Sequence, residues 1–207
     1  MISHYYKCIF IHIPKTGGAS IEKIIWPSER TEADLWMGFI DNYHNRYQTG
    51  GLQHLLSRQI RVEVGDDIFT NYYKFSFVRN PWDKAVSQYC YMSKRQDLRD
   101  FIGMKSNDSF KKYLDLIKLK KHVQWEPQTS FLKDHNGELL VDYIGRFETL
   151  HNDTALIFSH LGIKNNELPH IGKSVRRHYS EYYDNESVEM IEEMYSEDIY
   201  EYRYSYL

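Results

Sequence analysis

The sequence predicts an α/β protein whose mainly parallel sheet is flanked by helices. Two short apolar segments, residues 7–13 and 73–80, each lead directly into a helical pattern. Strands that feed helices in this way are typical of parallel sheets, since the helix returns the chain for the next strand. Ligands of such sheets bind outside the carboxyl ends of the strands. We therefore expect a binding site where these two segments end.

The first strand and helix are predicted near the N-terminus. The run KCIFIHI (7–13) is rich in β-branched and aromatic side chains, as expected for a buried parallel strand. It is followed by GASIEKII, in which Ile21, Ile24 and Ile25 fall on one face of a helix. Residues 27–53 are polar, aromatic and weakly periodic, which favours an insertion or lid over a core element.

The second strand and helix follow in the same order. Residues 55–65 have the pattern of a short helix, and YKFSFVRN (73–80) alternates apolar positions as a strand does. Pro81 then occupies the first turn of the next helix, where the missing N–H of proline costs no hydrogen bond. The sequence Arg-Asn-Pro therefore marks a second strand-to-helix junction.

The rest of the chain is expected to be mostly helical. Residues 96–125 are charged with a helical pattern, residues 137–148 fit a hairpin arm or a later strand, and residues 154–163 fit a helix that ends at Gly162. A basic loop follows over residues 168–183.

The last predicted element is a single helix over residues 185–204. Its apolar and aromatic side chains repeat at helical spacing and would share one face: Val188, Ile191, Tyr195, Ile199 and Tyr202.

Size and charge narrow the class of protein. The 207 residues fit one domain, 1–207, with lid or specificity insertions around 27–53 and 96–125. A formal net charge of −3 argues against nucleic acid or an anionic membrane as a partner. No signal peptide or membrane-spanning apolar run is recognisable, and two cysteines make neither a disulfide framework nor a zinc module. We expect a cytoplasmic protein.

The sequence PKTGGAS, which follows the first strand, has the composition of an anion-binding turn. Gly17 and Gly18 let the backbone approach a ligand closely, and the helix N-terminus that follows adds unpaired N–H donors. Lys15 supplies a positive charge, and Thr16 and Ser20 supply hydroxyl groups. The alternative is a glycine turn beside a solvated lysine. A Walker A loop is excluded here because its lysine must follow the glycines.

The second junction also carries groups that suit an anion. Arg79 ends the strand and offers a forked, permanently charged donor set that suits phosphate. Ser87 lies two helical turns after Asn80, so its hydroxyl can be aimed back along that face. The alternative is a surface salt bridge beside a helix serine. Two junctions that are each equipped for an anion suggest a ligand with phosphates at two ends.

The segments IHIPKTGGASIEK and FSFVRNPWDKAVSQY together resemble the two nucleotide-binding signatures of sulfotransferases that use 3′-phosphoadenosine 5′-phosphosulfate (PAPS). The match is similar to the branch that contains carbohydrate O-sulfotransferases and their compact bacterial relatives. Weaker similarity in LQHLLSRQI, EPQTSFL, YIGRFETL and GKSVRRHYSEYY extends it over most of the chain. The resemblance implies a P-loop-like nucleotide-binding fold and sulfuryl transfer to an acceptor hydroxyl, on a carbohydrate or another small molecule.

The resemblance also implies roles for the two junctions. In the family, the first loop binds the 5′-phosphosulfate, and the arginine and serine of the second bind the 3′-phosphate. Residues 15–20 are thus expected to bind PAPS, with Lys15 stabilising the leaving 5′-phosphate oxygen, while Arg79 and Ser87 hold the 3′-phosphate. Ala19 departs from the family pattern, in which a hydroxyl residue is usual, and removes one possible hydrogen bond.

The basic loop is expected, by the same resemblance, to close over the 3′-phosphate or the adenine. Lys173 and Ser174 would contact the nucleotide, and Arg177 would contact nucleotide or substrate. A charged surface loop is the alternative.

The acceptor hydroxyl requires a general base, and histidine titrates in the suitable range. His54, in GGLQHLLS, lies where relatives carry a histidine before a short helix, and it is the predicted base. His122 is the other candidate, either as the base or as a substrate contact. His12 alternates within the first strand and is expected to be structural. Glu22 and Asp83 are expected to be charges on helix surfaces.

Two other functions stay open from the sequence. A kinase-like phosphotransferase on a related fold would turn over ATP with Mg²⁺, whereas the sulfotransferase scheme requires no metal. A non-catalytic nucleotide-binding protein would bind the desulfated product, 3′,5′-adenosine bisphosphate (PAP), without any transfer.

Overall fold

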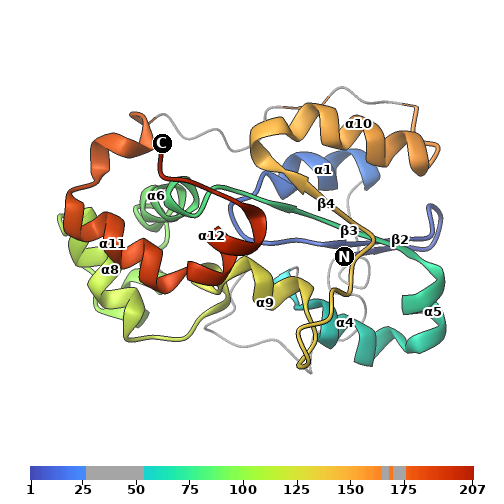
Figure 1. Ribbon diagram of the computed structural model, residues 1–207, viewed down its shortest axis with the longest axis horizontal. Helices are drawn as coiled ribbons and strands as arrows, with labels where there is room; N and C mark the ends of the chain where they lie inside the picture. The colour runs from blue at the N-terminus through green and yellow to red at the C-terminus, as the bar shows by residue number, and fades with distance from the viewer. Residues whose placement is uncertain (27–53, 165–167, 170–175) are drawn as a thin grey trace.

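The computed structural model describes residues 1–26, 54–164, 168–169 and 176–207. They include a four-stranded sheet in the order β1-β2-β3-β4 (Figure 1). The strands are β1 Ile2–Ser3, β2 Cys8–Ile11, β3 Tyr73–Val78 and β4 Tyr143–Arg146. Strands β2, β3 and β4 are parallel, whereas β1 is antiparallel to β2. The predicted mainly parallel sheet is confirmed, and the antiparallel edge strand is an addition to it.

Alternate residues of the strands point to opposite faces of the sheet, and each face packs against its own helices. On one face, Phe10, Phe75 and Phe77 pack with helices α1 (Gly18–Ile25) and α10 (Leu150–His160). Figure 1 shows these two helices on the same side of the strands. The sheet is therefore fully covered on this side, as a parallel sheet requires.

The opposite face is covered by shorter helices. Ile9, Ile11 and Val78 share a buried cluster with side chains of four helices. These helices are α4 Ser57–Val64, α5 Asp66–Asn71, α9 Gln128–Leu132 and α12 Ser196–Tyr202. The first of them confirms the helix predicted within 55–65.

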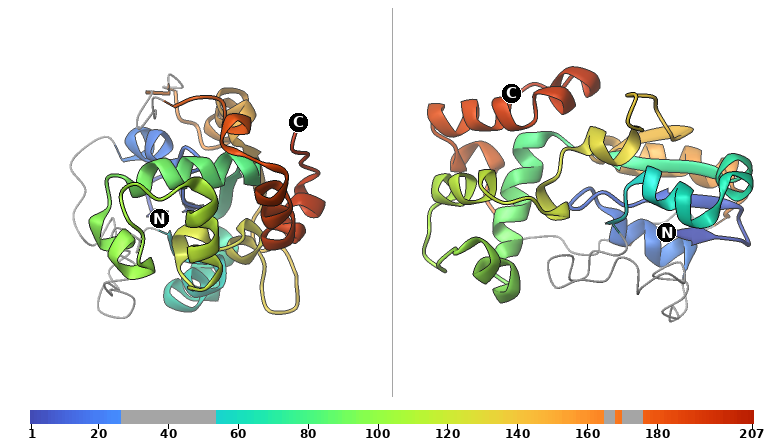
Figure 2. Two further views of the ribbon diagram at one scale, coloured as in Figure 1. Left: turned by 90° about the vertical axis from the view of Figure 1, so that its left-hand side faces the viewer. Right: turned by 90° about the horizontal axis from the view of Figure 1, so that it is seen from below.

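A third buried cluster lies beyond the carboxyl ends of β2 and β3 (Figures 1 and 2). It is built by α6 Pro81–Met92, α7 Gln96–Ile102, α8 Phe110–Lys118, the 3₁₀ turn η3 Val123–Trp125 and α11 Asn185–Met194. In Figure 2 these helices form one end of the molecule. The segment predicted as an insertion, 96–125, thus builds much of a helical layer at the end of the sheet where a site is expected.

Two predicted elements differ from the structure. The single helix predicted over 185–204 is wrong, because the chain breaks at Tyr195 and continues as α12 in a new direction. The Tyr195 side chain is buried, and its hydroxyl donates to the Trp125 carbonyl at 2.8 Å, so tertiary packing decides the break. Helix α10 also begins earlier than predicted, at Leu150.

The segment 137–148 contains both predicted alternatives: Leu139 forms an antiparallel bridge with Lys133, as a hairpin arm does, and the later strand β4 follows. In the basic loop, the described part forms a 3₁₀ turn, η5, over Tyr179–Tyr182. The predicted insertion at 27–53 lies outside the described residues. In the described part of the chain, no helix combines the length and apolar character needed to cross a bilayer.

Candidate active site

The loop between β2 and α1 passes through two residues in the left-handed region. Lys15 has a φ of 68° and Gly17 a φ of 86°. Glycine adopts this conformation without strain, whereas a lysine there costs about 1 kcal/mol. Helix α1 then begins at Gly18, and no side chain of the described residues caps its N-terminus by a hydrogen bond. The Ser20 N–H already donates to the Gly17 carbonyl at 3.1 Å, so the N–H groups available to an anion are those of Gly18 and Ala19 before it.

The second glycine of the pair has a different purpose. A Cβ atom at position 18 would lie 2.2 Å from Nε2 of His12, so only glycine leaves room for this imidazole. His12 is buried, and its Nδ1 lies 2.6 Å from Oε1 of Glu22 on α1. The structural role predicted for His12 fits this contact. The surface charge expected at Glu22 is wrong, since the carboxylate is buried as the partner of the imidazole.

The hydroxyl residues of the loop are turned inward. Thr16 is buried, and its hydroxyl donates to the Ile13 carbonyl at 2.9 Å. Its hydroxyl proton is thus used within the loop, and what Thr16 can still donate to a ligand is its backbone N–H. Ser20 is also buried, in the first turn of α1, and Ala19 between them is exposed.

The second junction places Arg79 beside this loop. Its guanidinium Nη1 donates to the Lys15 carbonyl at 2.8 Å, while Nε and Nη2 donate to Asp83 Oδ2 at 2.8 and 2.6 Å. The ring of Phe147 lies 3.7 Å from the guanidinium carbon. Asp83 also pairs with Arg176, which follows the undescribed residues of the basic loop. The surface position expected for Asp83 is therefore wrong, because this carboxylate joins two arginines.

One face of α6 connects the two junctions. Asp83, Ser87 and Tyr91 follow one another at intervals of four residues, so they line the same side of the helix. Asp83 holds Arg79 at one end, and the Tyr91 ring lies 4.1 Å from the Lys15 ammonium at the other. Ser87 lies between them, buried. The structure thus brings Lys15, Arg79 and Ser87 to one place.

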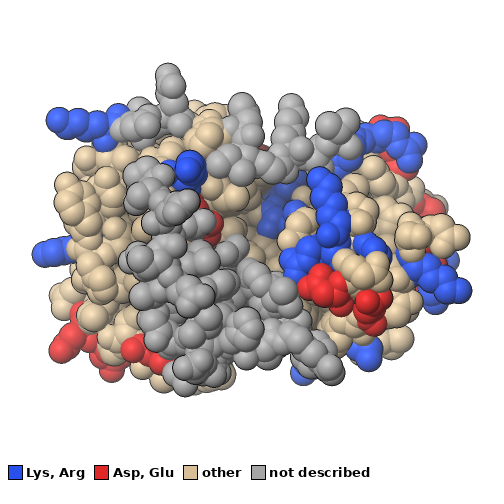
Figure 3. Space-filling view, turned by 180° about the vertical axis from the view of Figure 1, so that it is seen from behind, with Lys and Arg blue, Asp and Glu red and all other residues tan. Residues whose placement is uncertain are grey.

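The charge of Lys15 is poised for an anionic partner. The pKa of its ammonium group is lowered from 10.5 to about 8, mainly by burial and also by the positive charge of Arg79. An ammonium group without a nearby negative charge gains more binding free energy from a phosphate than a lysine that is already paired with a carboxylate. Figure 3 shows basic side chains gathered around a hollow in the middle of the rear face, beside the undescribed residues.

His54 lies next to the first junction. Its Nδ1 is 2.7 Å from the His12 carbonyl, and the two imidazole rings meet edge to face at 4.5 Å. A carbonyl only accepts, so Nδ1 of His54 carries the proton and Nε2 keeps a free lone pair. Burial lowers the pKa of His54 well below 6.5, and the nearby His12 acts in the same direction.

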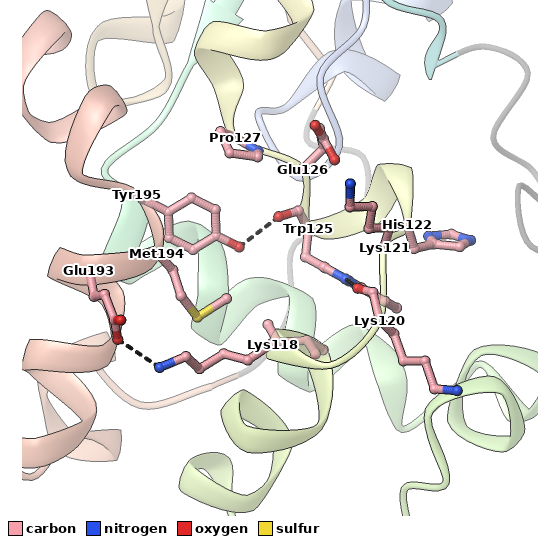
Figure 4. Close-up of a pocket in the computed structure, with 11 residues that line it drawn as sticks. Lys118, Lys120, Lys121, His122, Trp125, Glu126, Pro127, Glu193, Met194 and Tyr195 are labelled. Atoms are coloured by element: carbon pink, nitrogen blue, oxygen red, sulfur yellow. Dashed lines mark hydrogen bonds and ion pairs between the residues drawn. The ribbon is translucent and has the colours of Figure 1, made fainter.

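His122 lies elsewhere, in the helical layer. It packs against Trp125 at one end of a pocket of about 300 Å³ between α8, η3 and α11 (Figure 4). Its Nδ1 accepts the backbone N–H of Gln124 at 3.1 Å, so the proton of the neutral ring is on Nε2. Burial lowers the pKa of His122 to about 4. Neither Lys15 nor Arg79 lines this pocket.

The remaining predicted contacts are in the basic loop. Lys173 and Ser174 lie outside the described residues. Arg177 is exposed, lies 3.7 Å from Glu181 and covers the Tyr182 ring. It is its neighbour Arg176 that reaches Asp83.

Some residues at the junctions were not found by sequence reasoning. Tyr91, Asp83 and Arg176 were missed, as was Gln128, whose side chain bonds the backbone of Arg79. Gln128 belongs to EPQTSFL, one of the weaker similarities, which was the available signal for it. Tyr91 gave a periodic signal, four residues after Ser87 on the helix predicted from Pro81.

Comparison with known proteins identifies the group to which this site belongs. The sequence pattern of the Sulfotransferase family matches residues 1–205, nearly the whole chain. The chain belongs to the sulfotransferase family. An uncharacterized protein of Archaeoglobus fulgidus is 35% identical to this sulfotransferase over 104 residues, which is 50% of this chain and 79% of the relative. No solved structure matches the chain described here. Family membership supports sulfuryl transfer in general, and sulfotransferases generally take the sulfuryl group from PAPS.

Proposed function

We propose that this sulfotransferase transfers the sulfuryl group of PAPS to a carbohydrate hydroxyl by in-line displacement, with His54 as general base. The observation that carries the proposal is the contact between the two junctions, where Arg79 Nη1 donates to the Lys15 carbonyl at 2.8 Å. The 5′-phosphosulfate and 3′-phosphate of PAPS stand on one ribose, so they require two anion sites side by side. The sheet would then serve as a P-loop-like nucleotide-binding fold.

The donor would be held at both ends. The N–H groups at the start of α1 and the Lys15 ammonium bind the 5′-phosphosulfate, because α1 has an uncapped N-terminus. Arg79 and Ser87 bind the 3′-phosphate, with Lys173 and Ser174 as further contacts proposed from the resemblance. Arg176 lies close enough to lower the pKa of Lys15, so it adds to the positive charge around the donor.

In the reaction, Nε2 of His54 takes the proton of the acceptor hydroxyl while the acceptor oxygen bonds to sulfur. The bond between sulfur and the 5′-phosphate oxygen breaks, and Lys15 stabilises the charge that develops on that oxygen. His54 is suited to the first step because Nδ1 donates to the His12 carbonyl, which leaves the lone pair of the neutral ring on Nε2. His122 is the weaker candidate. Its Nδ1 lone pair already accepts the Gln124 N–H and its Nε2 carries the proton, so neither nitrogen is ready to take a proton.

Calorimetry with PAP and ADP tests the donor assignment on the wild type and on Arg79→Ala. PAP should bind more tightly than ADP, and Arg79→Ala should weaken PAP about 10- to 100-fold, the range of a charged hydrogen bond. Arg58→Ala is the matched control, because Arg58 also donates to a backbone carbonyl, that of Ser130, but on α4. Tighter binding of ADP together with Mg²⁺-dependent turnover of ATP would support a kinase-like enzyme instead.

A transfer assay with labelled donor and a panel of sugars and other alcohols tests the acceptor and the base. Labelled sugar product from the wild type, strongly reduced in His54→Gln, is the expected result. An inert wild type that still binds PAP would support a binding protein. The carbohydrate acceptor rests on the resemblance to the carbohydrate branch, and the cytoplasmic location stays a prediction from the sequence.

A further inference from the structure

Arg79 lies one residue past the last paired position of β3, which is Val78 opposite Arg146. Its backbone groups are thus not held by the strand ladder. The Gln128 side chain replaces that ladder: its Oε1 accepts the Arg79 N–H at 2.8 Å, and its Nε2 donates to the Arg79 carbonyl at 2.9 Å. The side-chain amide of Gln128 thereby fixes both backbone groups of Arg79, the residue proposed to bind the 3′-phosphate.

Gln128 is itself fixed from the C-terminal helix. Asp198 on α12 is fully buried, and its two carboxylate oxygens accept the backbone N–H groups of Gln128 and Thr129, each at 2.8 Å. The break of the chain at Tyr195 gives α12 the direction that places Asp198 there. The Lys84 ammonium, buried on α6, supplies a nearby positive charge for this carboxylate.

We propose that Gln128 and Asp198 are positioning residues that set the affinity of the site for the 3′-phosphate by fixing the backbone of Arg79. The proposal rests on the function proposed above. Hydrogen bonds lead from Asp198 through Gln128 to Arg79, and Arg79 reaches the Lys15 carbonyl. A small rotation at Arg79 would move the guanidinium away from the phosphate but leave the first junction, which binds the 5′ end, in place.

The 3′-phosphate selectivity of the enzyme distinguishes this role from a purely structural one. We define it as the dissociation constant of 5′-AMP divided by that of PAP, both from calorimetry. Gln128→Met, which keeps the length of the side chain but removes both hydrogen bonds, should lower the selectivity about tenfold and leave the affinity for 5′-AMP within about threefold. Gln124→Met is the matched control, since Gln124 is also buried, in η3, and should keep the selectivity.

Two further variants keep the test decisive if Gln128→Met does not fold. Gln128→Glu preserves the shape and the acceptor but removes the donor, and Asp198→Asn removes one acceptor oxygen. Each should lower the selectivity in the same direction by a smaller factor, with 5′-AMP binding retained. If the variants fold and keep the wild-type selectivity, even with both affinities reduced, the inference is overturned and the proposed function is not affected. A wild type that binds PAP and 5′-AMP equally would overturn the proposed function and the inference with it.

Discussion

The β2–α1 and β3–α6 junctions lie side by side, yet they are held by different means. At the first, the geometry comes from the chain itself: a left-handed lysine, two glycines and a helix N-terminus that no described side chain caps. At the second, the helix N-terminus is capped, since the Asn80 side chain accepts the N–H groups of Trp82 and Asp83. The donors left for a ligand at the second junction are therefore side-chain groups, the unbonded N–H groups of Arg79 and the Ser87 hydroxyl, whereas the first junction offers backbone N–H groups together with the Lys15 ammonium.

The second junction also depends on distant parts of the chain. Asn80 donates to the Ser205 carbonyl at 2.9 Å, and its backbone N–H donates to Glu148 at 2.7 Å. The Tyr206 ring packs edge to face on Trp82, so the C-terminal tyrosines support the start of α6. The first site is therefore disrupted most directly by local changes that add atoms or remove charge, although Arg79 and Tyr91 also contact Lys15. The second site can in addition be disrupted from remote positions.

The largest effect is expected from Lys15→Ala, which removes the one full charge that the first junction supplies. The rate of sulfuryl transfer at saturating donor should fall about 10²- to 10³-fold, the usual cost of losing one donor to a developing oxyanion. Initial rates with labelled PAPS measure it. Lys112→Ala, an exposed lysine on α8, is the control and should keep the wild-type rate. An equal loss in both variants would contradict a specific role for Lys15.

Gly18→Ala tests the steric constraint at the first junction. The added methyl group would overlap the His12 ring and should reduce the free energy of unfolding by about 2–3 kcal/mol. Gly103→Ala is the control, because that glycine has a positive φ of 73° with open space around it, and should cost about 1 kcal/mol. Chemical denaturation gives both values. A smaller loss for Gly18→Ala than for Gly103→Ala would mean that His12 moves aside freely.

The pH dependence of PAP binding separates the two junctions, because lysine titrates in the accessible range and arginine does not. The Lys15 ammonium is charged below its pKa of about 8 and neutral above it. The PAP affinity should thus fall only about twofold from pH 7 to 8 and approach a tenfold fall per unit above, where the phosphates no longer titrate. Calorimetry at fixed ionic strength measures this. Lys15→Ala should abolish the decline, and a decline that persists in this variant would assign it to another group.

The smallest effect is expected from Asn80→Ala at the second junction. Loss of the cap should lower the free energy of unfolding by about 1 kcal/mol and also weaken PAP binding, since Asn80 follows Arg79 directly. Ser109→Ala is the control, because it removes the cap of α8, where Ser109 accepts the Lys112 N–H. It should lower the free energy of unfolding by the same amount and leave PAP binding unchanged. PAP affinity equal in the two variants would show that the second junction is more tolerant than the comparison suggests.

Much of the first junction was predictable, because its geometry is local in sequence. The strand, the glycine pair and the helix start are consecutive, and Gly17 does occupy the positive φ that such a turn requires. The starts of the second strand at Tyr73 and of the helix at Pro81 were predictable for the same reason, whereas the strand ends earlier than predicted, at Val78. The roles of Thr16 and Glu22 were less so, since the direction of a side chain depends on what packs around it.

The second junction was predictable only in part. Arg79 and Ser87 could be selected from their spacing, but Gln128 is 49 residues from Arg79 in the sequence, and no local pattern joins them. The choice between adjacent arginines, 176 and 177, likewise depends on which side of the loop faces Asp83. The two histidines proposed as bases are both bonded through Nδ1, but Nδ1 of His54 donates to a carbonyl whereas Nδ1 of His122 accepts an N–H, and these are tertiary or loop contacts.

The sequence by itself determined the α/β class, the order of strands and helices through the two junctions, and membership of the sulfotransferase family. These follow from the periodicity of apolar residues and from short motifs, whose physical effects act over a few neighbouring residues. Tertiary structure alone decided which charges meet: the contact of Arg79 with Lys15, the burial of Glu22 and Asp198, and the break at Tyr195. Hydrogen bonds and burial depend on groups that folding brings together from distant positions, and no local pattern records them.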